Sequence, residues 1–146
     1  MPPPPGALKF NVDASSQGSA GLAGIGGILR DDKGTVLGKF SKCIGRSDPT
    51  RAELMAIWEA GIFLSKSKWG DGRSITIESD SQLACKWVGG FVQVPTVFED
   101  IVSKCRRALD KLGIHLVFVY REQNSAAHTL ARSGVGRDQA LVWEVG

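Results

Sequence analysis

The sequence predicts an α/β fold in which helices cover a mixed β-sheet. Three strand-like segments come first and are joined by short turns, and later strand-like segments alternate with amphipathic helices. Hairpins join antiparallel neighbours, whereas a helix between two strands favours a parallel crossover, so the two patterns together indicate a mixed sheet. A chain of 146 residues, 42% of them hydrophobic, suits one domain with a sizeable core. We therefore expect a single domain over residues 8–146.

We expect the first three strands at residues 8–13, 20–30 and 35–44. The first alternates apolar and polar side chains, as a half-buried strand does. The small polar segment 14–18 is then expected to be a loop. The second strand is glycine-rich yet apolar, and Gly24, Gly26 and Gly27 permit another backbone to approach closely. An Asp-Asp-Lys-Gly turn at 31–34 predicts a hairpin into the third strand.

The second half alternates between the two element types. Helices are expected from Thr50 to Lys66, Gln82 to Val88, Phe98 to Leu112 and Asn124 to about Ser133, with strands at 74–80 and 114–120. Asp48 and Pro49 mark the start of the first helix. Gly89 and Gly90 close the second, Asn124 is a capping residue for the last, and Gly134 is its expected stop.

Bulk composition excludes some function classes without choosing one. The net charge of +3 and pI of about 8.9 permit nucleic-acid binding but fit an ordinary surface equally well. The helix 98–112 has a basic outer face, which is either solvated or in contact with phosphates; it comprises Lys104, Arg106, Arg107 and Lys111. Three cysteines without a close pair argue against a disulfide framework or zinc site and favour reduced thiols: Cys43, Cys85 and Cys105.

The proline-rich stretch 1–7 is expected to be a linker, or the end of a piece cut from a longer protein. Residues 2–6 do not have the pattern of a signal peptide, and no apolar run approaches membrane-spanning length. We therefore expect an intracellular protein without a membrane partner, and the sequence does not separate nucleus from cytoplasm. A monomer is the default expectation.

Three acidic residues stand where strands and a helix would direct them to a common point. Asp13 and Asp80 each end a predicted strand, and Glu53 lies in the first turns of an amphipathic helix. Grouped carboxylates suit hard cations such as Mg²⁺, and two such ions close together can cleave phosphodiesters. Each residue also has a purely structural interpretation: strand end, helix-dipole charge or helix cap. Their joint occurrence favours a metal-dependent nuclease.

Five stretches in order resemble the type 1 ribonuclease H family, and most closely its plant subgroup in reverse-transcriptase-like proteins of non-LTR retroelements. Each motif is weak alone, but together they cover nearly everything from Leu8 to Ser133. The matching stretches are Lys9–Ala14, Gly24–Asp31, Arg51–Ala56, Ile77–Ser81 and Arg121–Arg132.

The resemblance implies a five-stranded mixed sheet of order 3-2-1-4-5 with the first three strands antiparallel. It also implies hydrolysis of the RNA strand of an RNA–DNA hybrid with two Mg²⁺ ions. Asp13 then corresponds to the carboxylate that bridges both metals, and Glu53 and Asp80 to the other two ligands. His128 falls where many members place a fourth acidic residue. Because Mg²⁺ prefers oxygen ligands, this histidine could favour Mn²⁺ as a substitute; its alternative is a plain helix-surface residue.

Substrate contacts are implied for the loop after the first strand, where the family meets RNA 2′-hydroxyls. The corresponding residues are Ser15, Ser16, Gln17, Gly18, Ser19 and, before the last helix, Asn124. Arg51 is either a partner of the acidic cluster or a surface charge.

Two departures from the family bear on catalysis. The loop 120–124 lacks the mobile histidine of many relatives, and the segment 89–95 has no Lys or Arg to grip a hybrid. The main alternative is therefore a nucleic-acid-binding module of the same fold with weak or no cleavage. A pure protein-interaction domain is a third hypothesis, which the three carboxylates argue against.

Overall fold

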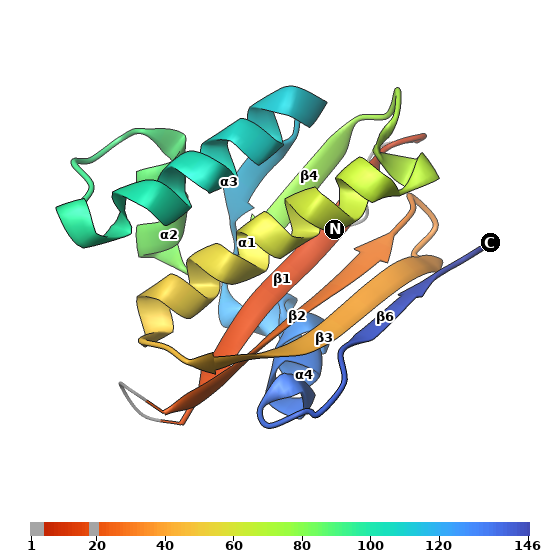
Figure 1. Ribbon diagram of the computed structural model, residues 1–146. Helices are drawn as coiled ribbons and strands as arrows, with labels where there is room; N and C mark the ends of the chain where they lie inside the picture. Colours follow the sequence, from red (N-terminus) through yellow and green to blue (C-terminus); the bar gives the residue numbers. More distant parts are fainter. Residues whose placement is uncertain (1–4, 18–20) are drawn as a thin grey trace.

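The computed structural model describes residues 5–17 and 21–146, so the predicted linker is described only at its last residues. Six strands form one mixed sheet in the order β5-β4-β1-β2-β3-β6 (Figure 1). β1 pairs in parallel with β4, and β4 with β5, while β1, β2, β3 and β6 are antiparallel neighbours. The strands are β1 (Leu8–Ser16), β2 (Leu22–Arg30), β3 (Val36–Arg46), β4 (Ile75–Ser79), β5 (His115–Phe118) and β6 (Leu141–Glu144).

The predicted order of the first five strands is confirmed, and a sixth strand is added to it. β6 is four residues long and pairs with the outer edge of β3. Most of its side chains are exposed, so its sequence lacks the apolar–polar alternation that would predict a strand. It forms because β3 has a free edge that the first five strands leave unpaired.

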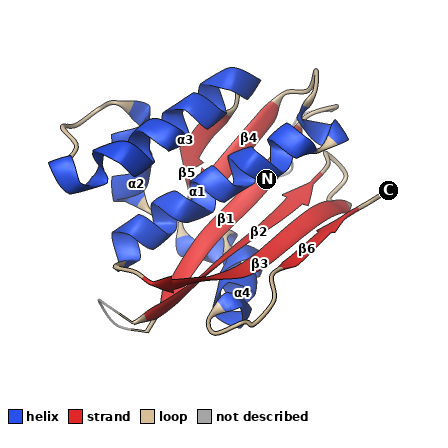
Figure 2. Cartoon of the chain, in the orientation of Figure 1, coloured by secondary structure: helices blue, strands red, loops and turns tan. Residues whose placement is uncertain are grey.

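Helices cover both faces of the sheet (Figure 2). α1 lies across one face and contacts β1, β2 and β4, with α2 and α3 packed beside it, whereas α4 lies on the opposite face against β1, β2 and β3. The helices are α1 (Pro49–Lys66), α2 (Gln82–Gly89), α3 (Glu99–Leu112) and α4 (Ser125–Gly134). No helix in the described part of the chain is both long and apolar enough to cross a membrane.

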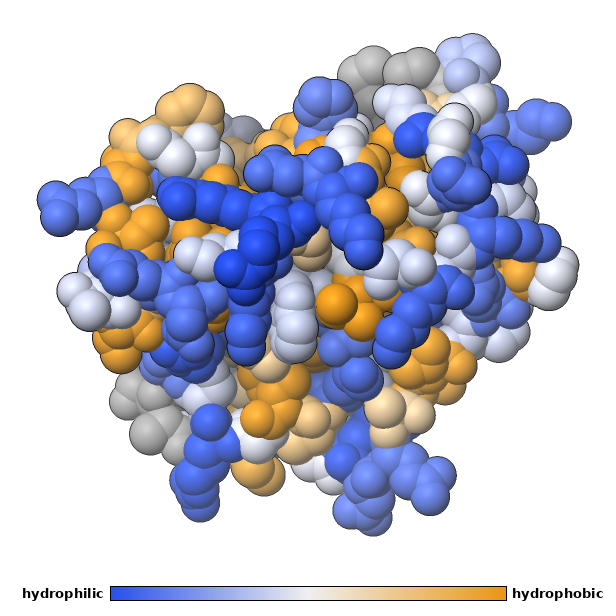
Figure 3. Space-filling model, turned by 45° about the horizontal axis from the view of Figure 1, so that its top comes forward, coloured by the Kyte–Doolittle hydropathy of each residue, from blue (hydrophilic) through white to orange (hydrophobic). Residues whose placement is uncertain are grey.

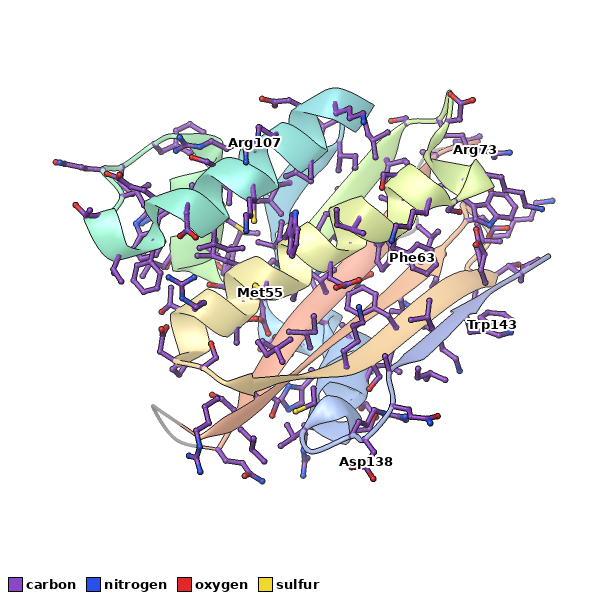
Figure 4. The ribbon with its side chains drawn as sticks, viewed as in Figure 1. Met55, Phe63, Arg73, Arg107, Asp138 and Trp143 are labelled. Atoms are coloured by element: carbon purple, nitrogen blue, oxygen red, sulfur yellow. The ribbon has the colours of Figure 1, made fainter. Side chains whose placement is uncertain are left out.

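The main core lies between the sheet and α1. Phe10 of β1 is fully buried, and its ring centroid is 5.8 Å from Phe40 of β3 and 5.4 Å from Phe63 of α1. Figure 4 shows Phe63 reaching from α1 toward the strands. These three packed rings hold α1 against the sheet. They therefore help to determine the position of the whole helix, including its first turns.

β1 is buried on both faces, although its alternation predicts a half-buried strand. Asn11 and Asp13 are only 4% and 1% exposed, because each makes a side-chain hydrogen bond to the start of α4. The strand also runs on to Ser16, so Ser15 and Ser16 are paired strand residues and the expected loop 14–18 starts later. The polar side chains of this strand are therefore interior groups, and they need partners there.

The close backbone approach predicted for the glycines of β2 is confirmed at Gly24 and Gly26, whereas a Cβ on Gly27 would meet the rings of Phe40 and Phe10. A Cβ on Gly24 would stand 2.3 Å from the carbonyl oxygen of Ala131, and one on Gly26 would stand 2.4 Å from the Ala131 nitrogen. Real Cβ atoms do not come this near backbone, so only glycine lets α4 lie directly on β2. The glycine-rich strand thus brings α4, and the residues it carries, down to the sheet.

Helix boundaries follow the sequence signals at some ends only. Asp48 caps α1 by accepting from the Arg51 backbone N–H at 2.9 Å, and Gly90 ends α2 with φ of 82°. Asn124 occupies the cap position of α4 but makes no capping hydrogen bond. Gly134 belongs to α4 and is not its stop; a Cβ there would stand 2.6 Å from the Lys42 carbonyl oxygen.

The outer surface is mixed in character. In Figure 3 the most hydrophilic side chains gather in the middle of the face shown, with apolar patches between them. Lys104, Arg107 and Lys111 of α3 are exposed, and α3 packs chiefly on α1 and α2. All three cysteines are free, as predicted, and burial raises the pKa of the Cys105 thiol to about 12.

Candidate active site

Three carboxylates converge at one end of the parallel pair β1 and β4. The register pairs Val12 with Ser79, so Asp13 and Asp80, the next residue of each segment, stand side by side. Glu53 comes from the second turn of α1 and is directed to the same point. One oxygen of each carboxylate lies within 4.8 Å of the others. The convergence predicted for Asp13, Glu53 and Asp80 is confirmed.

The structural roles considered for these carboxylates belong to other residues. Ser81, not Asp80, caps α2 by accepting from the Ala84 backbone N–H at 3.2 Å. Asp48 is the N-cap of α1 and Glu53 lies beyond its first turn, which has no acidic residue, while Asp13 lies within β1, three residues before its end.

Unpartnered oxygens show that the cluster is built for a cation. Among the described residues, five buried side-chain polar atoms have no hydrogen-bond partner, and three of them are Asp13 Oδ1, Glu53 Oε1 and Asp80 Oδ2. Buried polar atoms are normally satisfied, because an unsatisfied one costs about 1–3 kcal/mol. Oxygen-only ligands with several charges are what a hard divalent cation prefers. The residues present therefore fit a divalent metal ion.

The electrostatics of the metal-free cluster are unfavourable for three negative charges. Burial, followed by repulsion from Asp13 and Asp80, raises the pKa of Glu53 well above its usual range, and the Ala14 backbone N–H only partly opposes this. Burial and then Asp13 raise the pKa of Asp80 from 3.8 to about 6, although Arg121 and His128 act in the opposite direction. A bound cation removes this conflict, because opposite charge favours the ionised carboxylates.

His128 faces the cluster, as expected from its position in the sequence. Its Nδ1 lies 2.9 Å from Asp13 Oδ2, and its side chain is 28% exposed. It stands in the second turn of α4, where the helix crosses the end of β1. The structure thus makes His128 a neighbour of the central carboxylate and not a distant surface residue.

A buried polar network attaches the start of α4 to the sheet. Asn11 donates to Glu78 Oε1 at 2.9 Å and to Asn124 Oδ1 at 3.0 Å, and Asn124 donates in turn to the Val12 carbonyl at 2.8 Å. Asn124 is 1% exposed, so its amide serves this network at the point where a substrate contact was expected. Because His128 follows Asn124 by one helical turn, the network also fixes the position of His128 beside Asp13.

A polar hollow opens beside the carboxylates. The end of β1, the first turns of α1 and α4, and the turn before α4 supply its lining residues. They are Ala14, Ser15, Ser16, Pro49, Glu53, Arg121 and His128. Ser15 and Ser16, expected to contact substrate, are therefore near the carboxylates. Gln17 is exposed at the end of the strand, and Gly18 and Ser19 lie outside the described residues.

Of two arginines near the helix starts, Arg51 is a surface charge and Arg121 reaches the cluster. Arg51 does not contact the cluster: it donates to the Val97 carbonyl at 2.6 Å and its guanidinium lies 5.4 Å from the Phe98 ring centroid. Arg121, to which the sequence assigns no role, reaches Asp80, with Nε 3.9 Å from Oδ2. Two signals in the sequence point to it, since it begins the matching stretch Arg121–Arg132 and lies in the loop 120–124, but its contact with Asp80 depends on where that loop folds.

Comparisons with known proteins agree with this geometry. Residues 11–134 match the family described as reverse transcriptase-like. A curated protein of Arabidopsis thaliana, named as a ribonuclease H protein, is 33% identical over 127 residues, which make up 86% of this chain and 20% of that protein. The chain thus spans about a fifth of the length of this relative.

Solved structures share the architecture. LC11-RNase H1, isolated from compost by a metagenomic approach, superposes with a TM-score of 0.82 at 23% identity, covering 89% of this chain and 96% of the other. The structure of LC11-RNase H1 in complex with an RNA/DNA hybrid gives a TM-score of 0.78 at 25% identity, covering 88% and 96%. The fold is therefore the ribonuclease H fold, with β6 added to the expected five strands.

Proposed function

The chain belongs to the reverse transcriptase-like family, and on that premise we propose that it is a metal-dependent endonuclease that hydrolyses the RNA strand of RNA–DNA hybrids. The observation that carries the proposal is the set of three converging carboxylates with unpartnered buried oxygens, Asp13, Glu53 and Asp80. A related fold has been solved with such a hybrid bound, which supports the choice of substrate class. Folding alone does not require three repelling acids at one point.

Asp13, Glu53 and Asp80 would hold the metal, for which we propose two Mg²⁺ ions with Mn²⁺ as a substitute. When bound, such ions lower the pKa of an attacking water and stabilise the leaving oxygen of the phosphodiester. Three carboxylates offset much of the charge of two divalent ions and leave ligand positions open for water and phosphate.

The protein's own groups prepare the site for this chemistry. Glu53 and Asp80 have raised pKa values without metal, so cation binding is accompanied by loss of their protons. His128 holds Oδ2 of Asp13 while Oδ1 stays free to act as a ligand. The network through Asn11 and Asn124 keeps α4 in place and so preserves this orientation.

Substrate selection is assigned to the rim of the hollow. The hydroxyl groups of Ser15 and Ser16 stand in the same hollow as Glu53, where they would meet the 2′-hydroxyl groups that distinguish RNA from DNA. Gln17, the residue after Ser16, would extend this substrate contact beyond the hollow. In this proposal Asn124 acts indirectly, because its amide is committed inside the protein.

Two observations favour a second candidate function, a hybrid-binding module with weak or no cleavage. A histidine stands at the position of a fourth carboxylate, and the connection between α2 and α3 has no Lys or Arg from Gly89 to Pro95. The histidine would lower the affinity for metal, and the missing basic residues would lower the affinity for the hybrid. Neither feature changes the three carboxylates. The two functions differ in whether product forms, not in whether the hybrid is bound.

A panel of four labelled substrates tests the proposal: an RNA–DNA hybrid, duplex RNA, duplex DNA and single-stranded RNA, each incubated with Mg²⁺. We expect cleavage of the RNA strand of the hybrid only, with 3′-hydroxyl ends. Binding of the hybrid without product at high enzyme concentration would replace the nuclease with the binding module.

The assembly state is a further part of the proposal. We propose that the domain acts as a monomer within a longer protein, since the matched segment makes up only 20% of its relative. Light scattering coupled to size-exclusion chromatography, run on the purified domain, would give one 15.6 kDa species. A stable dimer would contradict this.

A further inference from the structure

We propose that Arg121 exchanges partners during the cycle: it pairs with Asp80 while the site lacks a cation, and it binds a phosphate of the nucleic acid once a cation occupies Asp80. This inference deepens the proposed function and rests on it. It assigns a phosphate-binding role to a residue for which neither the acidic motif nor the shortened loop provides one.

The backbone of Arg121 is held firmly while its side chain is free to move. Arg121 begins a 3₁₀ turn, Arg121–Gln123, and its carbonyl accepts from the Asn124 backbone N–H at 2.9 Å. Asn124 is buried and bonded to Asn11 and Val12, so the turn is attached to the sheet. The Arg121 side chain is nevertheless 75% exposed. Its guanidinium can therefore change position without any change of fold.

The contact with Asp80 is electrostatic and incomplete. Nε of Arg121 lies 3.9 Å from Oδ2 of Asp80, which is too long for a hydrogen bond. That same oxygen has no hydrogen-bond partner, although the Asp80 side chain is only 7% exposed. With the guanidinium largely in solvent and at this distance, the ion pair contributes little to stability. The pair lowers the charge of the empty cluster but is weak enough to be displaced.

A cation and the guanidinium compete for one carboxylate. The Asp80 oxygen that Arg121 faces is the buried one without a hydrogen-bond partner, and a cation held there would repel the guanidinium. Arginine cannot relieve this by losing its proton, so the side chain has to turn away. Arg121 lines the hollow together with Ser15, Ser16 and His128, where the substrate backbone is proposed to lie. A planar guanidinium matches a phosphate with two parallel hydrogen bonds.

This exchange predicts opposite effects on metal and substrate, which a purely structural residue would not produce. Arg121→Ala should bind Mn²⁺ about two- to fivefold more tightly, because the competing charge is gone. The same variant should bind the hybrid about tenfold more weakly in Mg²⁺, because a charged hydrogen-bonding partner of a phosphate is lost. Arg121→Lys keeps the charge but not the planar fork, so it should recover the Mn²⁺ affinity of the wild type and only part of the hybrid affinity.

The experiment titrates Mn²⁺ into wild type, Arg121→Ala, Arg121→Lys and the control Arg73→Ala, with free Mn²⁺ followed by electron paramagnetic resonance. Arg73 is an exposed arginine just before the start of β4 (Figure 4), whereas Asp80 directly follows the end of that strand. Hybrid affinity in Mg²⁺ is taken from the enzyme-concentration dependence of single-turnover cleavage. If the wild type does not cleave, the proposed function fails separately, and fluorescence anisotropy of the labelled hybrid gives the same affinity directly.

Tighter Mn²⁺ binding together with weaker hybrid binding in Arg121→Ala, and neither change in Arg73→Ala, is the expected result. Unchanged or weaker Mn²⁺ binding in Arg121→Ala overturns the pairing with Asp80. Hybrid affinity of Arg121→Ala equal to that of Arg73→Ala overturns the phosphate contact.

Discussion

The Nδ1 atom of His128 lies 2.9 Å from Oδ2 of Asp13, so a helix on one face of the sheet holds the most buried carboxylate of the cluster. The second oxygen of Asp13 has no partner. The histidine thus takes one oxygen and leaves the other for a cation. It also means that His128 influences the site through Asp13 even where it binds no metal itself.

His128→Asp is expected to shift the metal preference toward Mg²⁺. A carboxylate offers the oxygen ligand that Mg²⁺ prefers, whereas imidazole suits softer ions. The ratio of hydrolysis rates in Mg²⁺ and Mn²⁺ should rise, and the metal-free variant should lose about 1 kcal/mol of stability through repulsion from Asp13. Thr129→Asp, one residue later on exposed helix surface, is the control. Equal metal ratios in the two variants would show that His128 lies outside the ligand set.

The metal-free protein should become less stable as pH rises from about 4 to about 6. Asp80 has a pKa of about 6 in the fold against 3.8 when unperturbed, so the folded state binds more protons in this window than the unfolded state. Stability is then fully present below pH 3.8 and is lost as pH rises through the folded value. Glu53 acts in the same direction.

Urea unfolding in a chelator at several pH values measures this effect, which is on the order of 2 kcal/mol for Asp80. Asp80→Asn should flatten the pH dependence in this window, and Mg²⁺ should stabilise the wild type more at pH 7.5 than at pH 5. A slope that survives unchanged in Asp80→Asn would contradict the assignment.

Gly26→Ala should impair both the fold and the site. Its new methyl group would meet the backbone of α4 at Ala131, and backbone cannot give way as a flexible side chain can. We expect a loss of about 2 kcal/mol or more in the free energy of unfolding, and a fall in cleavage rate because α4 carries His128. Gly34→Asn is the control, since Gly34 has φ of 82° and open space around it, and asparagine tolerates that conformation.

Asn11→Leu should loosen the attachment of α4. The variant leaves the buried Asn124 Oδ1 without its donor, at a cost of about 1–3 kcal/mol, while Glu78 keeps its ion pair with Lys9. Ser125→Ala, on the exposed start of α4, should stay within about half a kcal/mol of the wild type. Hydrogen exchange at the first turn of α4 measures the local effect. Unchanged protection there would mean that the network does not fix the helix.

The sequence predicted the mixed sheet and the positions of the three carboxylates because both rest on local signals. Strand alternation, the hairpin turn at 31–34 and helix starts such as Asp48–Pro49 each depend on a few neighbouring residues. The structure contains the predicted turn and the predicted helix start. The resemblance to a known family then supplied the strand order. The cluster followed because Asp13 and Asp80 are next to each other once β1 and β4 are parallel.

Other features depend on contacts that no short stretch of sequence contains. β6 needs the open edge of β3, and the two-sided burial of β1 needs α4 above it. Asn124 looks like a cap but finds better partners in Asn11 and Val12 across the sheet. Arg121 enters the site only because its loop is short and is attached at that end of the sheet.

The most direct test of the central claim is strand-resolved cleavage of a labelled RNA–DNA hybrid in Mg²⁺ by wild type, Asp13→Asn and the surface control Asp110→Asn. The wild type and Asp110→Asn should cut the RNA strand, and Asp13→Asn should be slower by at least about a hundredfold while keeping its fold by circular dichroism. An Asp13→Asn protein that is folded and cuts as fast as the wild type would contradict a metal-dependent site at these carboxylates.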